Sequence, residues 1–118
     1  MIVDDIEANR AALIANLKGD YDIWEASDGA EALRVLEEVN GIDAILTDIR
    51  MPEMDGIELI KRIRGNYDYR HLAIIAVTQY GAQMQEENLL EIGANDFLYK
   101  PISPKVVKIR VKNALKNR

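Results

Sequence analysis

The chain has 118 residues, of which 48% are hydrophobic and 30% charged, which is ordinary for a single soluble domain with its own core. A formal net charge of -5 argues against direct binding of nucleic acid, and the lack of cysteine excludes disulfides, thiol catalysis and thiolate zinc sites. No apolar stretch approaches the ~20 residues that cross a bilayer, so we expect one cytoplasmic domain over residues 1–118 with no membrane partner.

Short apolar runs and helical patterns alternate from the start of the chain. Residues 2–3 form the stub of a strand, so we expect the sequence to begin within its first strand. Periodicity over residues 7–18 predicts a helix that Gly19 ends. Its expected inward residues are Ala11, Ile14, Ala15 and Leu17. Residues 22–26 are typical of a second strand.

The middle of the chain repeats this alternation. Ser27-Asp28 caps a second helix, which ends at Gly41. Two continuous apolar runs, 44–47 and 73–77, are typical of strands buried on both faces of a parallel sheet. Between them, Asp55-Gly56 has the chemistry of a turn and leads into a third helix. We expect its inward residues to be Ile57, Ile60 and Ile63.

The last elements complete the pattern. A helix over residues 82–92 ends at Gly93, and residues 97–99 form a fifth strand. Ser103-Pro104 caps the final helix, with proline at its first helical position. Five strands that alternate with five helices predict right-handed crossovers and a three-layer α/β sandwich around a parallel sheet.

Acidic residues follow two of these strands. Asp4 and Asp5 end the first strand and Asp48 ends the third, so all three should meet at the carboxyl edge of the sheet. Three neighbouring carboxylates repel one another and need a cation to stay ionised. Oxygen ligands without cysteine or histidine favour a hard ion, Mg²⁺ or Mn²⁺. An acidic pair alone is more often solvated surface, but a third carboxylate strengthens the prediction.

Two further polar residues end the last strands. Lys100 supplies the compact positive charge that a phosphoryl oxygen attracts, and Thr78 offers a hydroxyl donor. Taken alone, Lys100 could simply be a surface lysine near the start of a helix, and Thr78 could simply be a capping residue. Together they predict a ring of polar groups around Asp48, suited to a cation-dependent phosphate site.

Five motifs in order resemble the receiver domains of two-component response regulators, which also occur in hybrid histidine kinases. They are Val3-Asp4-Asp5, the segment 48–56, Ala76-Val-Thr78, the segment 93–97 and Lys100-Pro101. The resemblance covers essentially the whole chain. It implies a flavodoxin-like fold with the sheet order 2-1-3-4-5.

The resemblance also implies a role for each site residue. Asp48 would accept a phosphoryl group from the phosphohistidine of a sensor histidine kinase or histidine phosphotransfer protein. Asp4, Asp5, an Asp48 oxygen and the backbone carbonyl of Arg50 would hold Mg²⁺, and Lys100 and Thr78 would contact the phosphoryl oxygens. The chain would then be a phosphoacceptor switch rather than an enzyme.

In such a switch, Thr78 moves toward the phosphoryl group and Phe97 rotates into the space that it leaves. The alternative is that Phe97 is a fixed core residue. The Lys100–Pro101 peptide bond, which is often cis in this family, adjoins the site. Arg50, Gln79 and Tyr80 flank Asp48 or Thr78, and we expect them to tune the lifetime of the phosphoryl group.

The last helix indicates where the signal leaves. Its inward stripe is expected to be Val107, Val111, Ala114 and Leu115. Val106 and Ile109 fall outside this stripe. From residue 105 on, the helix carries basic residues and no acidic residue. The preceding helix is acidic through Glu86, Glu87 and Glu91. These surfaces suit a homodimer or an output domain, attached or separate, although solvated faces explain the same pattern.

Other classes fit less well. A flavodoxin would need a hydroxyl-rich phosphate loop after its first strand, and a haloacid-dehalogenase-type phosphatase would need an aspartate where this chain has Arg50. Two alternatives stay open within the family. The domain could bind partners without being phosphorylated, or it could belong to a hybrid kinase rather than to a response regulator.

Overall fold

The computed structural model describes residues 1–79 and 83–117, with the backbone alone described for residues 83–86. Its five strands form one parallel sheet in the order β2-β1-β3-β4-β5, as the resemblance implies. The strands are β1 (Ile2–Val3), β2 (Glu25–Ala26), β3 (Ala44–Asp48), β4 (Ala73–Gln79) and β5 (Asp96–Lys100).

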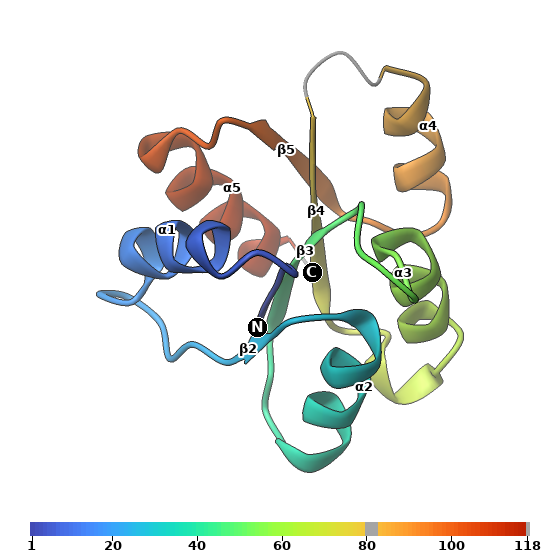
Figure 1. The fold of residues 1–118 in the computed structure, drawn as a ribbon. Helices are drawn as coiled ribbons and strands as arrows, with labels where there is room; N and C mark the ends of the chain where they lie inside the picture. The colour runs from blue at the N-terminus through green and yellow to red at the C-terminus, as the bar shows by residue number, and fades with distance from the viewer. Residues whose placement is uncertain (80–82, 118) are drawn as a thin grey trace.

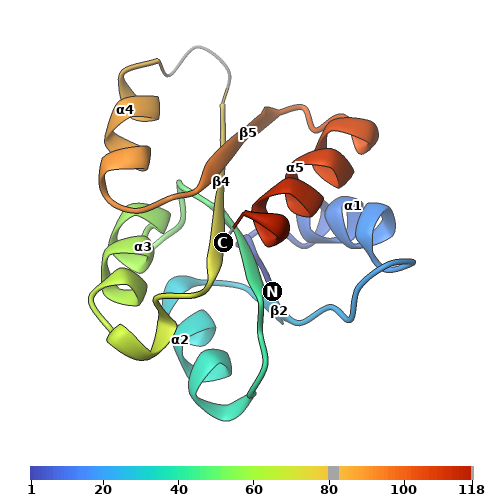
Figure 2. The same cartoon turned by 180° about the vertical axis from the view of Figure 1, so that it is seen from behind.

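Helices cover both faces of this sheet. They are α1 (Glu7–Leu17), α2 (Gly29–Glu38), α3 (Gly56–Arg64), α4 (Gln83–Glu91) and α5 (Pro104–Lys116), with a 3₁₀ turn, η1, at Tyr67–Tyr69. Helices α1 and α5 lie on one face and α2, α3 and α4 on the other (Figures 1 and 2), which confirms the three-layer sandwich. None of the described helices has the length and apolar character that crossing a bilayer requires.

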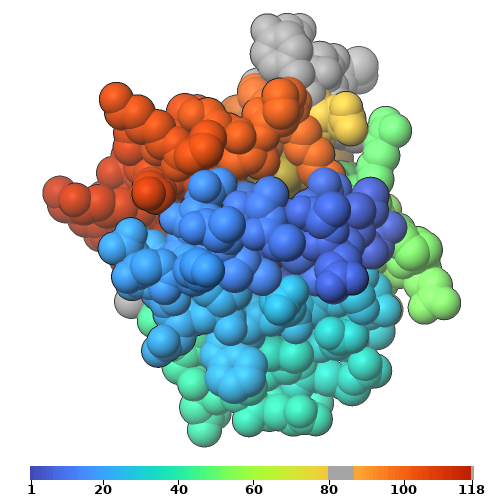
Figure 3. Space-filling view, turned by 60° about the vertical axis from the view of Figure 1, so that its left-hand side comes forward, coloured from blue at the N-terminus to red at the C-terminus, as the bar shows by residue number. Residues whose placement is uncertain are grey.

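The sheet separates two apolar cores, and β4 contributes to both. Ile74 and Ala76 pack into the core shared with α2, α3 and α4, whereas Ala73, Ile75 and Val77 pack into the core shared with α1 and α5. Because helices cover both faces, all five side chains are buried. This explains why the sequence shows continuous apolar runs here rather than alternation. On the outer surface, α1 and α5 lie side by side (Figure 3).

Three predicted helix starts are confirmed by their caps. The side chain of Asp28 accepts a hydrogen bond from the backbone N–H of Glu31 at 2.7 Å, and Asp55 accepts one from Glu58 at 2.9 Å. Ser103 caps α5 in the same way. Such caps satisfy backbone donors that have no partner within the helix, and each contributes about 1 kcal/mol.

The predicted inward face of α1 is wrong in part. Ala11 and Ala15 are exposed, whereas Leu13 and Leu17 are buried. Alanine adds little apolar area to either face of a helix, so the leucines decide which face turns inward.

The second strand is shorter than predicted. The strand spans Glu25–Ala26 and pairs with β1, which is itself two residues long. The backbone oxygen of Trp24 still accepts a hydrogen bond from the N–H of Ile2 at 2.8 Å. Trp24, in the predicted strand, is 48% exposed.

Candidate functional site

Four neighbouring strands bring polar side chains to the carboxyl edge of the sheet. Asp4 directly follows β1, Asp48 ends β3, Thr78 is the penultimate residue of β4 and Lys100 ends β5. In the sheet register, Asp48 pairs with Val77, so Thr78 lies one position beyond it on the adjacent strand. These four residues, which the sequence singles out, therefore lie at one edge of the sheet.

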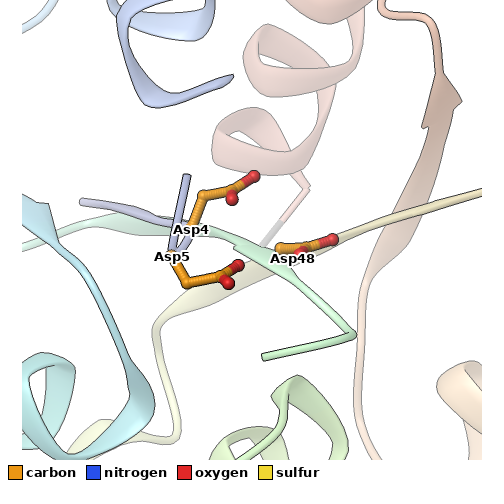
Figure 4. A group of neighbouring side chains, drawn as sticks. All are labelled: Asp4, Asp5 and Asp48. Carbon is orange, nitrogen blue, oxygen red and sulfur yellow. The ribbon is translucent and has the colours of Figure 1, made fainter. Parts of the chain in front are cut away.

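The acidic part of the site is a cluster of three carboxylates. Asp4, Asp5 and Asp48 each offer an oxygen within 4.8 Å of the others, and their side chains point toward a common space (Figure 4). Asp4 is 1% exposed and Asp48 is 6% exposed, whereas Asp5 lies on the surface. One oxygen of Asp4 accepts a hydrogen bond from the backbone N–H of Ile6 at 2.9 Å, which fixes the orientation of that carboxylate.

Lys100 supplies the positive charge beside this cluster. Its Nζ lies 3.0 Å from Oδ1 of Asp48 and 3.6 Å from Oδ2 of Asp4. One ammonium group thus faces three carboxylates, and the site retains an excess of negative charge. A second cation at this site would relieve the remaining repulsion.

Burial raises the pKa of Asp48 above its ordinary value, because the carboxylate loses water that would stabilise its charge. The hydrogen bond and charge of Lys100 lower the pKa, the charge of Asp4 raises it, and the backbone N–H of Ile49 lowers it. The pKa remains raised overall, so Lys100 only partly offsets the cost of ionising this buried carboxyl.

A cavity of about 190 Å³ opens beside Asp48. It is lined by Asp5, Ile6, Asp48, Ile49, Arg50, Thr78, Gln79 and Lys100. One water molecule takes up ~30 Å³ in the liquid, so a phosphoryl group with its surrounding water fits this volume. Asp48, Lys100 and Thr78, which the sequence singles out, all line one space.

The residues present fit a small hard cation. The donors at the rim of the cavity are carboxylate oxygens, the ligand type that Mg²⁺ prefers, and there are few enough of them to leave positions for water and phosphate. Arg50 lines the same cavity, where its backbone carbonyl was expected to serve as a further ligand. The donor set is therefore that of a magnesium site rather than of a zinc site.

Comparison with known proteins decides the family. The family model described as "Response regulator receiver domain" matches residues 1–112. The chain belongs to this family. It is 33% identical to a chemotaxis protein CheY homolog of Campylobacter jejuni, across 98% of this chain and 90% of that protein. It is also 37% identical to the transcriptional regulatory protein SrrA of Staphylococcus aureus, across 98% of this chain and 47% of SrrA.

A solved structure agrees with this assignment. The signal receiver domain of a signal transduction histidine kinase from Syntrophus aciditrophicus superposes with a TM-score of 0.87 at 33% identity, covering 98% of this chain and 87% of that one. Receiver domains similar to this one thus occur in proteins with different overall functions.

The remaining predicted site residues of this receiver domain lie in varied surroundings. Arg50 and Gln79, the predicted modulators, are exposed and line the cavity beside Asp48, whereas Tyr80 lies outside the described residues. Phe97 is half-buried against the core under α4, with its ring edge-on to Tyr99 at 5.5 Å between centroids. The peptide bond before Pro101 is cis.

Sequence reasoning missed two residues that position the receiver site. Arg10 donates a hydrogen bond to the backbone oxygen of Asp4 at 2.7 Å and pairs with Glu25 at 3.1 Å, which ties α1 to the loop bearing the carboxylates. Gly56 lies so close to β3 that a Cβ there would overlap the backbone oxygen of Asp48. The Asp55-Gly56 turn was a signal for the glycine, but nothing in the sequence indicated its contact.

Proposed function

We propose that this receiver domain is a phosphoacceptor switch in which Asp48 takes a phosphoryl group from a phosphohistidine. The donor would be a sensor histidine kinase or a histidine phosphotransfer protein. The observation that carries the proposal is the buried Asp48 carboxylate, 3.0 Å from Lys100 and open to a cavity of about 190 Å³. Transfer breaks the P–N bond of the phosphohistidine, whose electron pair stays on the imidazole, and forms a P–O bond to an Asp48 carboxylate oxygen.

The other residues of the site would neutralise charge and orient the phosphoryl group. Asp4, Asp5, Asp48 and the backbone carbonyl of Arg50 would hold Mg²⁺ or Mn²⁺ directly or through water. When bound, the ion would neutralise part of the charge on the phosphoryl oxygens. Positioning and charge neutralisation of this kind account for most of the catalysis of phosphoryl transfer.

Lys100 and Thr78 would act on the phosphoryl oxygens directly. The ammonium group of Lys100 already lies beside Asp48, so it would pair with an oxygen of the new acyl phosphate. The Thr78 hydroxyl lines the same cavity and would donate a hydrogen bond to another oxygen. Phosphorylation adds about -1.5 to -2 charges, which strengthens both contacts.

We further propose that Thr78 couples the phosphoryl group to Phe97. Movement of Thr78 toward the phosphoryl group would open space for the half-buried Phe97 ring. The two residues are near each other because Thr78 pairs with Tyr99 in the sheet register, and Phe97 lies two residues before Tyr99 on β5. Such a switch shifts a pre-existing equilibrium. A tenfold shift requires only ~1.4 kcal/mol of differential stabilisation.

The surface formed by α4, β5 and α5 would transmit the change to a partner, and we call it the output surface. It carries the exposed apolar residues Leu90, Val106 and Ile109, with Glu87 and Glu91 on α4 and a row of bases on α5. The side chain of Glu86 lies outside those described. This surface would dock a second copy or an output domain, attached or separate, of a cytoplasmic signalling pathway.

A receiver that binds partners without phosphorylation is not favoured by this site. Such a domain has no need for a buried carboxylate, an acidic cluster and a lysine together, yet Asp48 clusters with two other carboxylates and Lys100 lies 3.0 Å from it.

Intact-mass spectrometry after incubation with an acyl phosphate and Mg²⁺ tests the proposal. We expect one phosphoryl adduct on the wild-type chain and none on Asp48→Asn, and removal of Mg²⁺ by chelation should abolish the wild-type adduct. The matched control is Asp20→Asn, which changes an exposed aspartate outside the site and should leave the adduct intact. An adduct that survives in Asp48→Asn would refute Asp48 as the acceptor.

A further inference from the structure

The outer edge of β5 carries a cluster of three side chains, two of which have no part in the proposed function. They are Asp96 and Phe97 on β5 and Arg110 on α5, which we call the edge cluster. Strand β5 is the last strand of the sheet, with α5 on one face and α4 on the other (Figures 1 and 2). The contact between Arg110 of α5 and the Phe97 ring is made at this edge.

A single carboxylate oxygen links the members of this cluster. Oδ1 of Asp96 accepts a hydrogen bond from the backbone N–H of Phe97 at 2.8 Å and another from Nη1 of Arg110 at 2.7 Å. The ion pair is half-buried, with 29% of the aspartate side chain and 39% of the arginine side chain exposed. Asp96 therefore fixes the guanidinium group relative to the backbone of Phe97.

The same guanidinium group also contacts the ring of Phe97. The Arg110 guanidinium carbon lies 6.0 Å from the centroid of the ring, within the range of a cation–π interaction. On another side, the ring meets Tyr99 edge-on at 5.5 Å. The half-buried Phe97 ring, which also packs against the core under α4, is thus restrained by groups at its own edge of the sheet.

We propose that Arg110 is a positioning residue that holds the half-buried Phe97 ring toward the edge of β5 and so opposes the further inward rotation that accompanies the phosphorylated state. The inference rests on the proposed role of Phe97 as the switch aromatic. On the sheet, Phe97 pairs with Ala76, two residues before Thr78, and inward rotation would carry the ring toward that small residue. Because the Asp96 ion pair anchors the guanidinium group, Arg110 cannot follow the ring, and the cation–π contact is lost.

The strength of this restraint sets the size of the expected effect. A cation–π contact at a partly exposed site changes an equilibrium by about two- to fivefold. Replacing Arg110 should therefore shift Phe97 inward by that factor. It should also tighten the binding of any ligand that selects the inward state by the same factor, because the two equilibria are linked.

The first measurement needs no ligand. In Arg110→Gln, nuclear Overhauser contacts between the Phe97 ring and the Ala76 methyl group should grow relative to the wild type. The matched control is Lys112→Gln, which removes an exposed positive charge from the same helix and should leave these contacts unchanged. Equal contacts in the wild type and Arg110→Gln would overturn the proposal.

The second measurement is a double-mutant cycle with beryllium fluoride and Mg²⁺ as the probe for the phosphorylated state. Arg110→Gln should bind the probe about two- to fivefold more tightly than the wild type. In a Phe97→Leu background, Arg110→Gln should have no effect, and an equal gain in both backgrounds would contradict the proposal. Failure of the wild type to bind the probe would count against the proposed function, while the ligand-free measurement would still decide the role of Arg110.

Discussion

At Asp48, the features that suit a phosphoryl acceptor also reduce stability. Burial raises the pKa of this carboxyl, and Asp4 adds repulsion at close range. A carboxyl group whose pKa is higher in the folded than in the unfolded chain favours the folded state most when the pH is below the unfolded-state pKa. This contribution to stability is lost as the pH rises through the folded-state pKa. At neutral pH, ionised Asp48 therefore costs folding free energy that a neutral group of the same shape would not.

Asp48→Asn should therefore stabilise the chain at neutral pH in the absence of divalent cations. We expect a gain on the order of 1 kcal/mol, or about 4 °C in melting temperature. The gain should shrink at low pH, where Asp48 is protonated. Mg²⁺ should stabilise the wild type more than the variant, because a ligand of the folded state adds stability by mass action.

Thermal unfolding followed by circular dichroism, with and without Mg²⁺, measures both effects. Asp20→Asn removes an equal charge from an exposed position and should leave the melting temperature nearly unchanged. A lower melting temperature for Asp48→Asn in metal-free buffer would show that the Lys100 ion pair outweighs burial and repulsion.

At the scale of single elements, the start of α3 determines how β3 presents Asp48. The N–H of Gly56 donates a hydrogen bond to the backbone oxygen of Ile49 at 2.8 Å, and its Cα packs against the end of the strand. A side chain at position 56 would collide with backbone atoms of Asp48 and Ile49, which cannot move aside as a flexible side chain does. The helix start and the position of Asp48 are therefore coupled.

Gly56→Ala should destabilise the chain by about 1–3 kcal/mol, the usual cost of forcing a methyl group into packed structure. It should also slow phosphorylation from an acyl phosphate, because the end of β3 must shift. Urea unfolding and the rate of adduct formation measure the two effects. Gly19→Ala is the matched control, since no described heavy atom lies within 4 Å of its added Cβ. Equal stabilities of the two variants would contradict this account.

Sequence patterns predicted these elements unequally well. The runs that became β3 and β4 were clear because both faces of each strand are buried, and the caps at Asp28, Asp55 and Ser103 follow from local chemistry. The inward face of α1 was not clear, because alanines give no strong preference. The contact of Gly56 with β3 joins two elements, so no local pattern reveals it.

At the scale of the whole molecule, the sequence predicted the layers and the carboxyl-edge site. The alternation of strands and helices predicts helical crossovers between parallel strands. In such a sheet the carboxyl ends of the strands lie at one edge, so the polar residues that follow four of the strands come together there. The cavity beside Asp48 could not be predicted, because its lining depends on how Ile6, Arg50 and Gln79 orient after folding.

The output surface allows a prediction about association. Acidic residues on α4 and bases on α5 flank β5, so two copies related by a twofold axis would place opposite charges together. We expect the sedimentation-derived mass to rise with concentration after phosphorylation, and Ile109→Glu to abolish the rise. The control is Tyr67→Glu, at an exposed aromatic residue remote in sequence from this surface. A phosphorylated chain that stays monomeric would contradict the dimer and leave an output domain as the proposed partner of this surface.

The most direct test of the central claim is to locate the phosphoryl group after transfer from a phosphohistidine protein in the presence of Mg²⁺. Reduction of the acyl phosphate with borohydride marks the modified aspartate, and tandem mass spectrometry of peptides identifies it. We expect the mark at residue 48 alone, and its loss when Mg²⁺ is chelated before transfer. A mark at residue 4 or 5, or transfer at full rate without any divalent cation, would contradict that claim.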